Sequence, residues 1–314
     1  MGDDETEQLT EKLFHTLRDY YLELSDGTIV YPAHGHGSPC GADIGDRLRS
    51  TIGYERETNP FLQYDKLSDF KEFALSGTLP VPTYYPRMKE INREGPEILG
   101  SIPLPGALTP KEFAEALSGD VQLIDTRHML AFGGGHIAGS MNIGSSPMMS
   151  IWAGWLLDPD IPILLVLGSD DEVEAVAKRF LRTGYTNIGG YLAGGITAWI
   201  EAGKELRDRR EIDVHTLREI LRSKDKDAQV VDVRAPSEWE EGHIPGAVHI
   251  FLPGLRERIG ELDASRPVFT YCASGYRASI AASILLQEGF QDVANVPGSW
   301  KAWKAAGFET EGGE

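Results

Sequence analysis

Cysteine is almost absent from this chain: only Cys40 and Cys272 occur among its 314 residues. We expect the two to lie in different domains, so a structural disulfide between them is not expected. Oxidising compartments favour such cross-links, whereas reducing compartments keep thiols free. The cysteine content therefore predicts a cytoplasmic protein in which each thiol stands alone.

Basic residues are in deficit, and long apolar runs are missing. The chain has 30 Lys and Arg against 48 Asp and Glu, a net charge of −18 at pH 7. Nucleic acids and anionic membrane surfaces bind basic patches, so neither is expected as a partner. The longest apolar run, residues 161–167, is far too short to cross a bilayer, and the acidic residues 1–7 do not resemble a signal peptide. We therefore expect no nucleic-acid and no membrane partner.

The segment around Cys272 has the features of a reactive thiol site. An apolar strand over residues 268–271 ends at Cys272, a short loop with Gly275 follows, and a helix is expected to begin at about Arg277. The first N–H groups of a helix lack partners within it, and together with the positive helix end they favour a nearby anion. An adjacent arginine acts in the same direction. The pattern therefore favours a thiolate nucleophile at Cys272 over a buried structural cysteine.

A second copy of the surrounding pattern indicates the fold class. Asp-x-Arg and Gly-His-Ile-x-Gly motifs follow one another in both copies, at residues 125–127 and 135–139, and again at residues 232–234 and 242–246. In each copy, short β-rich runs alternate with amphipathic helices, which is typical of βαβ units on a parallel sheet. The last two-thirds of the chain is therefore expected to be a tandem α/β repeat, with parallel sheets flanked by helices.

These motifs resemble those of the rhodanese family, whose Asp-x-Arg, Gly-His-Ile-x-Gly-Ala and Cys-loop-Arg elements all occur in the second copy. The resemblance implies that Cys272 accepts a sulfane sulfur atom from thiosulfate or a low-molecular-weight persulfide and passes it to a thiol or cyanide acceptor. It also implies a loop that cradles the persulfide, formed by Ala273, Ser274, Gly275, Tyr276 and Arg277. Related phosphatases of this fold have one more residue between cysteine and arginine, so the shorter loop here indicates sulfur rather than phosphate chemistry.

The first copy lacks a nucleophile. Counting back from the glycine that ends the next helix in each copy aligns Leu167 with Cys272 and Glu172 with Arg277. The aligned loop carries three carboxylates, at residues 170–172, which would repel an anion. We therefore expect an inactive repeat that packs against its neighbour.

The paired Asp and Arg of the motif are interpreted as scaffold. Asp232 and Arg234 recur as Asp125 and Arg127 in the copy without a nucleophile, so they are not specific to the reactive site. Arg234 is predicted to pair with Glu238.

The first hundred residues are of a different kind. An amphipathic helix is expected over residues 5–24 and a strand over residues 28–31, with an apolar helix face formed by Leu9, Leu13, Leu17 and Tyr21. Together with residues 32–41, 51–61 and 83–96, this region resembles the C-terminal part of a metallo-β-lactamase-fold persulfide dioxygenase, an enzyme often fused ahead of rhodanese domains.

The resemblance does not extend to the iron site of that family. Its His-x-His-x-Asp-His cluster is missing among the 8 histidines of this chain. His34 and His36 are too few ligands to hold a metal tightly, and Cys40 has no neighbouring base or arginine to activate it. We therefore expect no metal and no cofactor.

Proline-rich and charged segments separate the expected domains. Residues 95–110 are typical of an extended linker that ends at a helix cap, and the charged residues 204–211 precede a matching helix at Asp213. We predict a partial metallo-β-lactamase-like segment over residues 1–103, an inactive rhodanese-like domain over 104–207 and a catalytic rhodanese domain over 208–314.

The expected partners are the small-molecule sulfur donor and acceptor, with a homodimer or a separate persulfide dioxygenase half as the expected protein partner. Two alternatives to the enzyme remain open at this stage. One is a non-catalytic scaffold that docks a partner through the inactive repeat and the partial N-terminal domain. The other is a fragment of a dioxygenase–rhodanese fusion completed by a missing N-terminal half.

Overall fold

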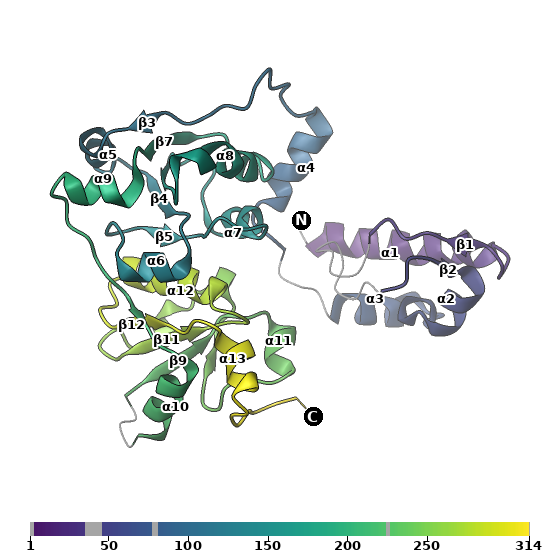
Figure 1. Ribbon diagram of the computed structural model, residues 1–314. Helices are drawn as coiled ribbons and strands as arrows, with labels where there is room; N and C mark the ends of the chain where they lie inside the picture. Colours follow the sequence, from purple (N-terminus) through teal and green to yellow (C-terminus); the bar gives the residue numbers. More distant parts are fainter. Residues whose placement is uncertain (1–2, 35–45, 77–80, 224–226, 314) are drawn as a thin grey trace. The chain divides into compact units, whose positions relative to one another are not determined.

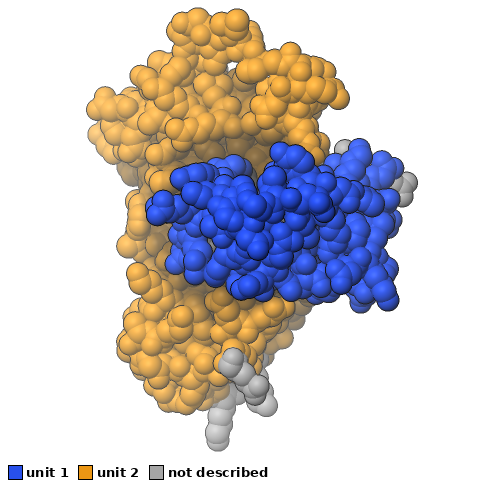
Figure 2. All heavy atoms as spheres, turned by 90° about the vertical axis from the view of Figure 1, so that its right-hand side faces the viewer, with its two compact units in different colours: residues 1–82 blue, residues 83–314 orange. Residues whose placement is uncertain are grey.

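The computed structural model describes residues 3–34, 46–76, 81–223 and 227–313. The chain divides into two compact units, Met1–Pro82 and Thr83–Glu314, which Figure 2 distinguishes by colour. The domain boundaries predicted near residues 103 and 208 lie within the second unit and stay predictions.

The first unit is mostly helical. Its two short strands pair antiparallel, with Ile29 opposite Thr51. Its elements are α1 (Asp3–Asp19), η1 (Tyr21–Glu23), β1 (Ile29–Val30), β2 (Ser50–Thr51), α2 (Ile52–Thr58), η2 (Pro60–Leu62) and α3 (Leu67–Ser76), where η marks a 3₁₀ turn. The core forms where α1 meets α3: the rings of Phe14 and Phe70 lie 5.3 Å apart, and both are buried.

The apolar face predicted for the first helix was wrong. Leu9 and Leu13 are 45% and 42% exposed, whereas Phe14 is buried against α3. The aromatic side chains of α1 and α3 make the contact between these helices, and Leu9 and Leu13 of α1 face solvent instead. The α-helix ends at Asp19 rather than Leu24, and the chain continues as the 3₁₀ turn η1.

The first repeat, residues 107–201, is a five-stranded parallel sheet with helices around it (Figure 1). The strands lie in the order β3 (Ala107–Leu108), β7 (Ile188–Leu192), β6 (Ile163–Val166), β4 (Gln122–Asp125), β5 (Met141–Asn142). The helices are α5 (Pro110–Ala116), α6 (Met129–Gly134), α7 (Met149–Leu156), α8 (Val173–Leu181) and α9 (Gly195–Glu201), with the 3₁₀ turn η3 (Asp170–Glu172) before α8.

The second repeat, residues 210–305, has the same architecture. Its parallel strands lie in the order β10 (Val248–His249), β9 (Gln229–Asp232), β11 (Val268–Tyr271), β12 (Val293–Asn295), β8 (Arg210–Glu211). The helices are α10 (Val214–Arg222), α11 (Pro236–Glu240), α12 (Tyr276–Gln287) and α13 (Ser299–Ala305), with the turns η4 (Leu252–Gly254) and η5 (Ile259–Glu261). When this order is followed from β8 to β10, it matches the order of the first repeat from β3 to β5, strand for strand. The predicted tandem α/β fold is therefore confirmed.

Local sequence signals account for the start of each repeat. Thr109 and Glu112 form a reciprocal capping box at the start of α5, with Pro110 at the first helical position. Asp213 caps α10 by accepting a hydrogen bond of 2.8 Å from the backbone N–H of Thr216. The central strands β6 and β11 are buried along their whole length, as a parallel sheet covered on both faces requires.

The helix α12, which follows Cys272, lies between the repeats. Eight consecutive residues of α12, 278–285, are buried, because one side packs on its own sheet and another on β5 of the first repeat (Figure 1). One core contains apolar side chains of both repeats, and each repeat has a further core of its own. Asn142 of β5 makes polar contacts with α12. The Ser279 hydroxyl donates a hydrogen bond to the Asn142 side chain, and the backbone N–H of Asn142 donates to Ser283 Oγ at 3.1 Å. The expectation that the first repeat packs against its neighbour is therefore confirmed.

The helix α4 (Tyr85–Glu94) belongs to the second unit and packs on the first repeat. The hydroxyl of Thr83, just before it, donates to the carbonyl of Gly154 at 2.9 Å, and Arg87 lies 3.8 Å from Asp160. No helix within the described ranges combines the length and the apolar character that crossing a membrane requires.

Candidate functional site

The thiol of Cys272 lies at the carboxyl end of the central strand of the second sheet. Cys272 directly follows β11, whose neighbours are β9 and β12, and the chain reaches β11 after crossing from the edge strand β10. In open parallel sheets, ligands bind at such points, beyond the carboxyl ends of the strands. Cys272 is a free cysteine and is 1% exposed. A buried sulfur at this place is accessible only to a small reacting group.

The loop after Cys272 directs its backbone at the sulfur. The N–H of Gly275 donates a hydrogen bond of 3.1 Å to Cys272 Sγ. Gly275 precedes the first residue of α12 and has φ = 108°, a left-handed conformation that glycine adopts without strain. A side chain here would also collide with Met129 of the first repeat, whose sulfur lies 2.9 Å from the position of an added Cβ. Glycine is therefore required both for the turn and for the close approach of the two repeats.

Gly298 and the first residues of α13 hold the loop through hydrogen bonds. Gly298 N–H donates to Ser274 O at 3.1 Å, and Trp300 N–H donates to Cys272 O at 2.9 Å. Between them, the buried Ser299 accepts a hydrogen bond of 3.1 Å from Cys272 N–H. Ser299 has φ = 44°, the only positive φ among the described residues other than glycine. Such a conformation costs free energy, and the hydrogen bonds of its hydroxyl offset that cost.

Sequence reasoning missed Ser299. Its counterpart in the first repeat is Gly195, which has φ = 58°. A glycine at this position in one copy indicates that the backbone there adopts the left-handed conformation. Aligning Gly195 with Ser299 could therefore have identified Ser299 from the sequence.

Arg277 is held by a carboxylate. Its guanidinium donates two hydrogen bonds to Glu238, at 2.5 and 2.7 Å. Burial alone would raise the pKa of Glu238, but the hydrogen bonds and charge of Arg277 outweigh it and hold that pKa below the usual value. Burial alone would lower the pKa of Arg277, but the hydrogen bonds to Glu238 and the charge of an ionised Cys272 raise it. Arg277 therefore remains charged and is held against Glu238.

The predicted pairing of Arg234 with Glu238 was wrong. Arg234 binds Asp232 through two guanidinium nitrogens, with the shortest contact at 2.6 Å, and donates to Gly242 O at 2.7 Å. Side chains two residues apart at a strand end point to the same side, which brings this pair together. Arg127 makes the equivalent contacts with Asp125 and Gly135 O in the first repeat, so the scaffold interpretation is supported.

The five predicted loop residues are brought together, but Tyr276 points away from the sulfur. Its hydroxyl donates a hydrogen bond of 2.7 Å to the carbonyl of Gly144 in the first repeat. Burial raises the pKa of Tyr276 to about 12, so it is uncharged at neutral pH. Any contact of Tyr276 with a bound sulfur comes from its backbone, while its side chain fastens the loop to the neighbouring repeat.

Tyr276→Phe is expected to lower the free energy of unfolding of the second unit by about 1 kcal/mol, the usual net value of one hydrogen bond. Differential scanning calorimetry measures this as a lower Tm. Tyr31→Phe is the control, because Tyr31 is 70% exposed in the other unit and should leave the Tm of the second unit unchanged. Equal Tm values for Tyr276→Phe and the parent protein would contradict the anchoring role.

The corresponding loop of the first repeat is occupied by its own carboxylates. Leu167 follows β6 as Cys272 follows β11, and Leu167 is buried in the core. The Asp170 carboxylate accepts the N–H of Gly194 at 3.1 Å, and the Glu172 carboxylate lies 3.3 Å from where a Cβ on Gly168 would be. The predicted absence of a nucleophile thus coincides with a loop that already holds negative charge.

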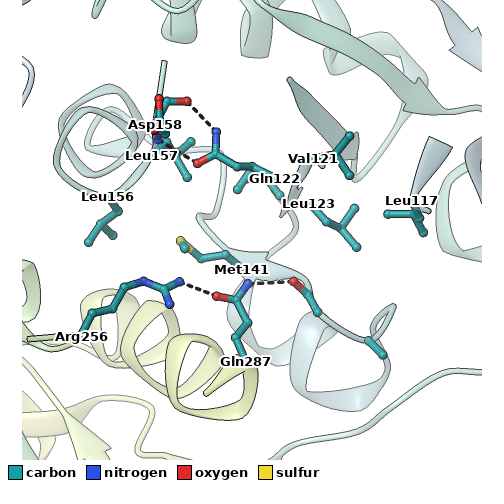
Figure 3. Close-up of a pocket in the computed structure, with 13 residues that line it drawn as sticks. Leu117, Val121, Gln122, Leu123, Met141, Leu156, Leu157, Asp158, Arg256 and Gln287 are labelled. Carbon is teal, nitrogen blue, oxygen red and sulfur yellow. Dashed lines mark hydrogen bonds between the residues drawn. The ribbon is translucent and has the colours of Figure 1, made fainter. Parts of the chain in front are cut away.

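A cavity of about 450 Å³ is lined by residues of both repeats (Figure 3). Its polar groups bind one another: Gln122 exchanges hydrogen bonds with the backbone of Asp158, and Gln287 links Arg256 to Gly139 O. The residues that line it include neither Cys272 nor its loop. It is therefore separate from the sulfur site.

The metal prediction concerns residues that the structure describes only in part. His34 lies in an exposed turn, while His36 and Cys40 fall outside the described residues. Across the described ranges, no three His, Cys, Asp or Glu side chains gather in a way that could hold a metal ion.

We expect purified protein to contain far less than one iron or zinc per chain, because the sequence lacks the ligand cluster that tight binding needs. Elemental analysis after dialysis measures this, and an oxygen electrode with glutathione persulfide checks the matching absence of oxygen uptake. A content near one metal per chain would contradict the expectation.

Comparison with known proteins identifies the family. The rhodanese-like domain model matches residues 109–202 and 214–306, more than half of the chain. The chain therefore belongs to the rhodanese-like family, and it contains two such domains. We refer to the repeats from here on as the first and second rhodanese domains.

Individual relatives are similar to parts of the chain. The uncharacterized protein YqhL of Bacillus subtilis is 41% identical over 76 residues, which are 24% of this chain and 60% of YqhL. The putative sulfur carrier protein YrkF of the same organism is 32% identical over 142 residues, 43% of this chain and 75% of YrkF. A metallo-beta-lactamase structure from Staphylococcus aureus is 26% identical, with a TM-score of 0.49, and the match covers 60% of this chain and 52% of that one.

Proposed function

We propose that this protein is a sulfurtransferase that carries a sulfur atom on Cys272. The observation that carries the proposal is the hydrogen bond from Gly275 N–H to Cys272 Sγ, in a loop whose one cation is Arg277. A backbone N–H on the sulfur and a guanidinium in the same loop favour the anionic forms that the reaction needs, the thiolate and the persulfide. The similarity to YrkF, a putative sulfur carrier protein, supports the same chemistry.

The reaction is a double displacement. The Cys272 thiolate attacks the outer sulfur of the donor, a new S–S bond forms, and the old S–S bond breaks. The electron pair of the broken bond leaves with sulfite when the donor is thiosulfate, or with a thiolate when it is a persulfide. An acceptor thiolate or cyanide then attacks the outer sulfur of the Cys272 persulfide and releases the Cys272 thiolate. Neither step needs an external oxidant or reductant.

Mass spectrometry of the treated protein tests the proposal directly. After incubation with thiosulfate or a persulfide, the peptide with Cys272 is expected to gain about 32 daltons, the mass of one sulfur atom. Addition of cyanide should remove the added mass and form thiocyanate in equal amount. A Cys272 peptide that stays unmodified with both donors would overturn the proposed function.

A further inference from the structure

The loop around the thiol has little net positive charge of its own. Ala273, Ser274 and Gly275 carry no charge, and Tyr276 is neutral with its hydroxyl bound in the first domain. Arg277 is therefore the one cation that the loop itself contributes. Anion-binding loops rely on such charges together with backbone N–H groups.

Glu238 cancels that charge. Its two carboxylate oxygens each accept a hydrogen bond from Arg277, and the Glu238 side chain remains 32% exposed while that of Arg277 is 15% exposed. The carboxylate is fixed by its own element as well, since Glu238 also accepts the N–H of Ala235 at the start of α11, at 3.0 Å. The Glu238 carboxylate is therefore fixed by the backbone of α11 as well as by Arg277.

Neither Arg234 nor the lysines of α13 add a fixed positive charge to the loop. Arg234 is buried and bound to Asp232. On α13, Lys301 and Lys304 are exposed, so solvent and salt screen their charges. An ionised Cys272, Arg277 and Glu238 together leave one net negative charge at the place where the donor must bind.

We propose that Glu238 selects the sulfur donor by charge, favouring a low-molecular-weight persulfide, which brings one negative charge to the loop, over the thiosulfate dianion. The inference rests on the proposed sulfur transfer and names its donor class. The repulsion energy from a fixed carboxylate is proportional to the charge of the donor. This energy is therefore about twice as large for the thiosulfate dianion as for a persulfide anion. In both reactions, Cys272 gains one sulfur atom and the leaving group, sulfite or thiolate, keeps the electron pair of the broken bond.

Glu238→Gln is the decisive variant, because glutamine keeps an oxygen that can accept the Ala235 N–H while it removes the charge. Donors are thiosulfate and cysteine persulfide, whose zwitterionic amino acid part leaves it a net charge near −1. Because the Glu238 side chain is 32% exposed, solvent screens its charge. With a dielectric near that of water and a separation of about 6 Å, kcat/KM for thiosulfate should rise about tenfold, and for cysteine persulfide about threefold. The thiosulfate-to-persulfide ratio of kcat/KM therefore rises, and high salt should reduce this change.

Two control variants separate local charge from other effects. Glu240→Gln changes the net charge of the protein by the same amount at an exposed position of the same helix, and it should leave the ratio unchanged. Glu238→Asp keeps the charge but shortens the side chain, and its ratio should stay close to that of the parent protein.

An unchanged ratio in Glu238→Gln, or an equal rise in Glu238→Asp, would overturn the role of Glu238 in selection. That failure is distinct from failure of the proposed function. If Cys272 of the parent protein takes up sulfur and only the ratio is insensitive to Glu238, the sulfur transfer stands and the selectivity inference falls.

Discussion

Cys272→Ser is expected to abolish sulfur transfer, with residual activity of no more than a few per cent. Serine is similar in size to cysteine and retains a group that the Gly275 N–H can contact. Its hydroxyl is not ionised near neutral pH and forms no stable bond to a sulfane sulfur, so the covalent intermediate is lost. Thiocyanate formation from thiosulfate and cyanide, measured by absorbance, gives the rate.

The interpretation of Cys272→Ser requires that the protein remains folded. The backbone contacts that hold the loop, from Trp300 N–H and to Ser299 Oγ, do not involve the sulfur, so the Tm should change little. Cys40→Ser is the matched control for the other thiol and should leave the rate unchanged. Substantial transfer by Cys272→Ser would show that sulfur moves without this covalent intermediate.

Leu167→Cys in a Cys272→Ser background is expected to remain inactive, although it returns a cysteine to the equivalent position after β6. The first loop has Glu172 where the second has Arg277, so the new thiol would lack the cation that favours a thiolate. The carboxylates of the loop add repulsion, on the order of 0.5 kcal/mol for each exposed group after solvent screening. The Asp170 carboxylate also accepts the N–H of Gly194, which removes a donor that an anion would need.

The same transfer assay and the same mass spectrometry apply to this double variant. Transfer near the level of the parent protein would show that the first loop can hold a persulfide, and that the alignment of Glu172 with Arg277 is mistaken. The single variant Leu167→Cys serves as the control for folding, since Leu167 is buried and a smaller side chain there lowers stability.

Much of the fold could be predicted because its signals are local and occur twice. Capping residues such as Thr109 and Asp213 mark helix starts, and the repeated Asp-x-Arg motif ends the same strand in both domains. The first unit was harder to predict. Leu9 and Leu13 have helical spacing, but spacing alone cannot show which side of α1 meets Phe70, a residue far along the chain.

The sequence by itself determined the position of the candidate thiol, the length of its loop and the glycine at its turn, and it places Leu167 rather than a cysteine at the equivalent position of the first domain. These depend on neighbouring residues, because a strand end, a turn and a helix start are set by local backbone geometry. Only the tertiary structure decided the contacts of the loop. Glu238 reaches Arg277 from 39 positions away, and Tyr276 reaches Gly144 across 132 positions into the other domain. Such pairs form because a parallel sheet brings the carboxyl ends of distant strands together, and nothing in the local pattern records which side chains meet there.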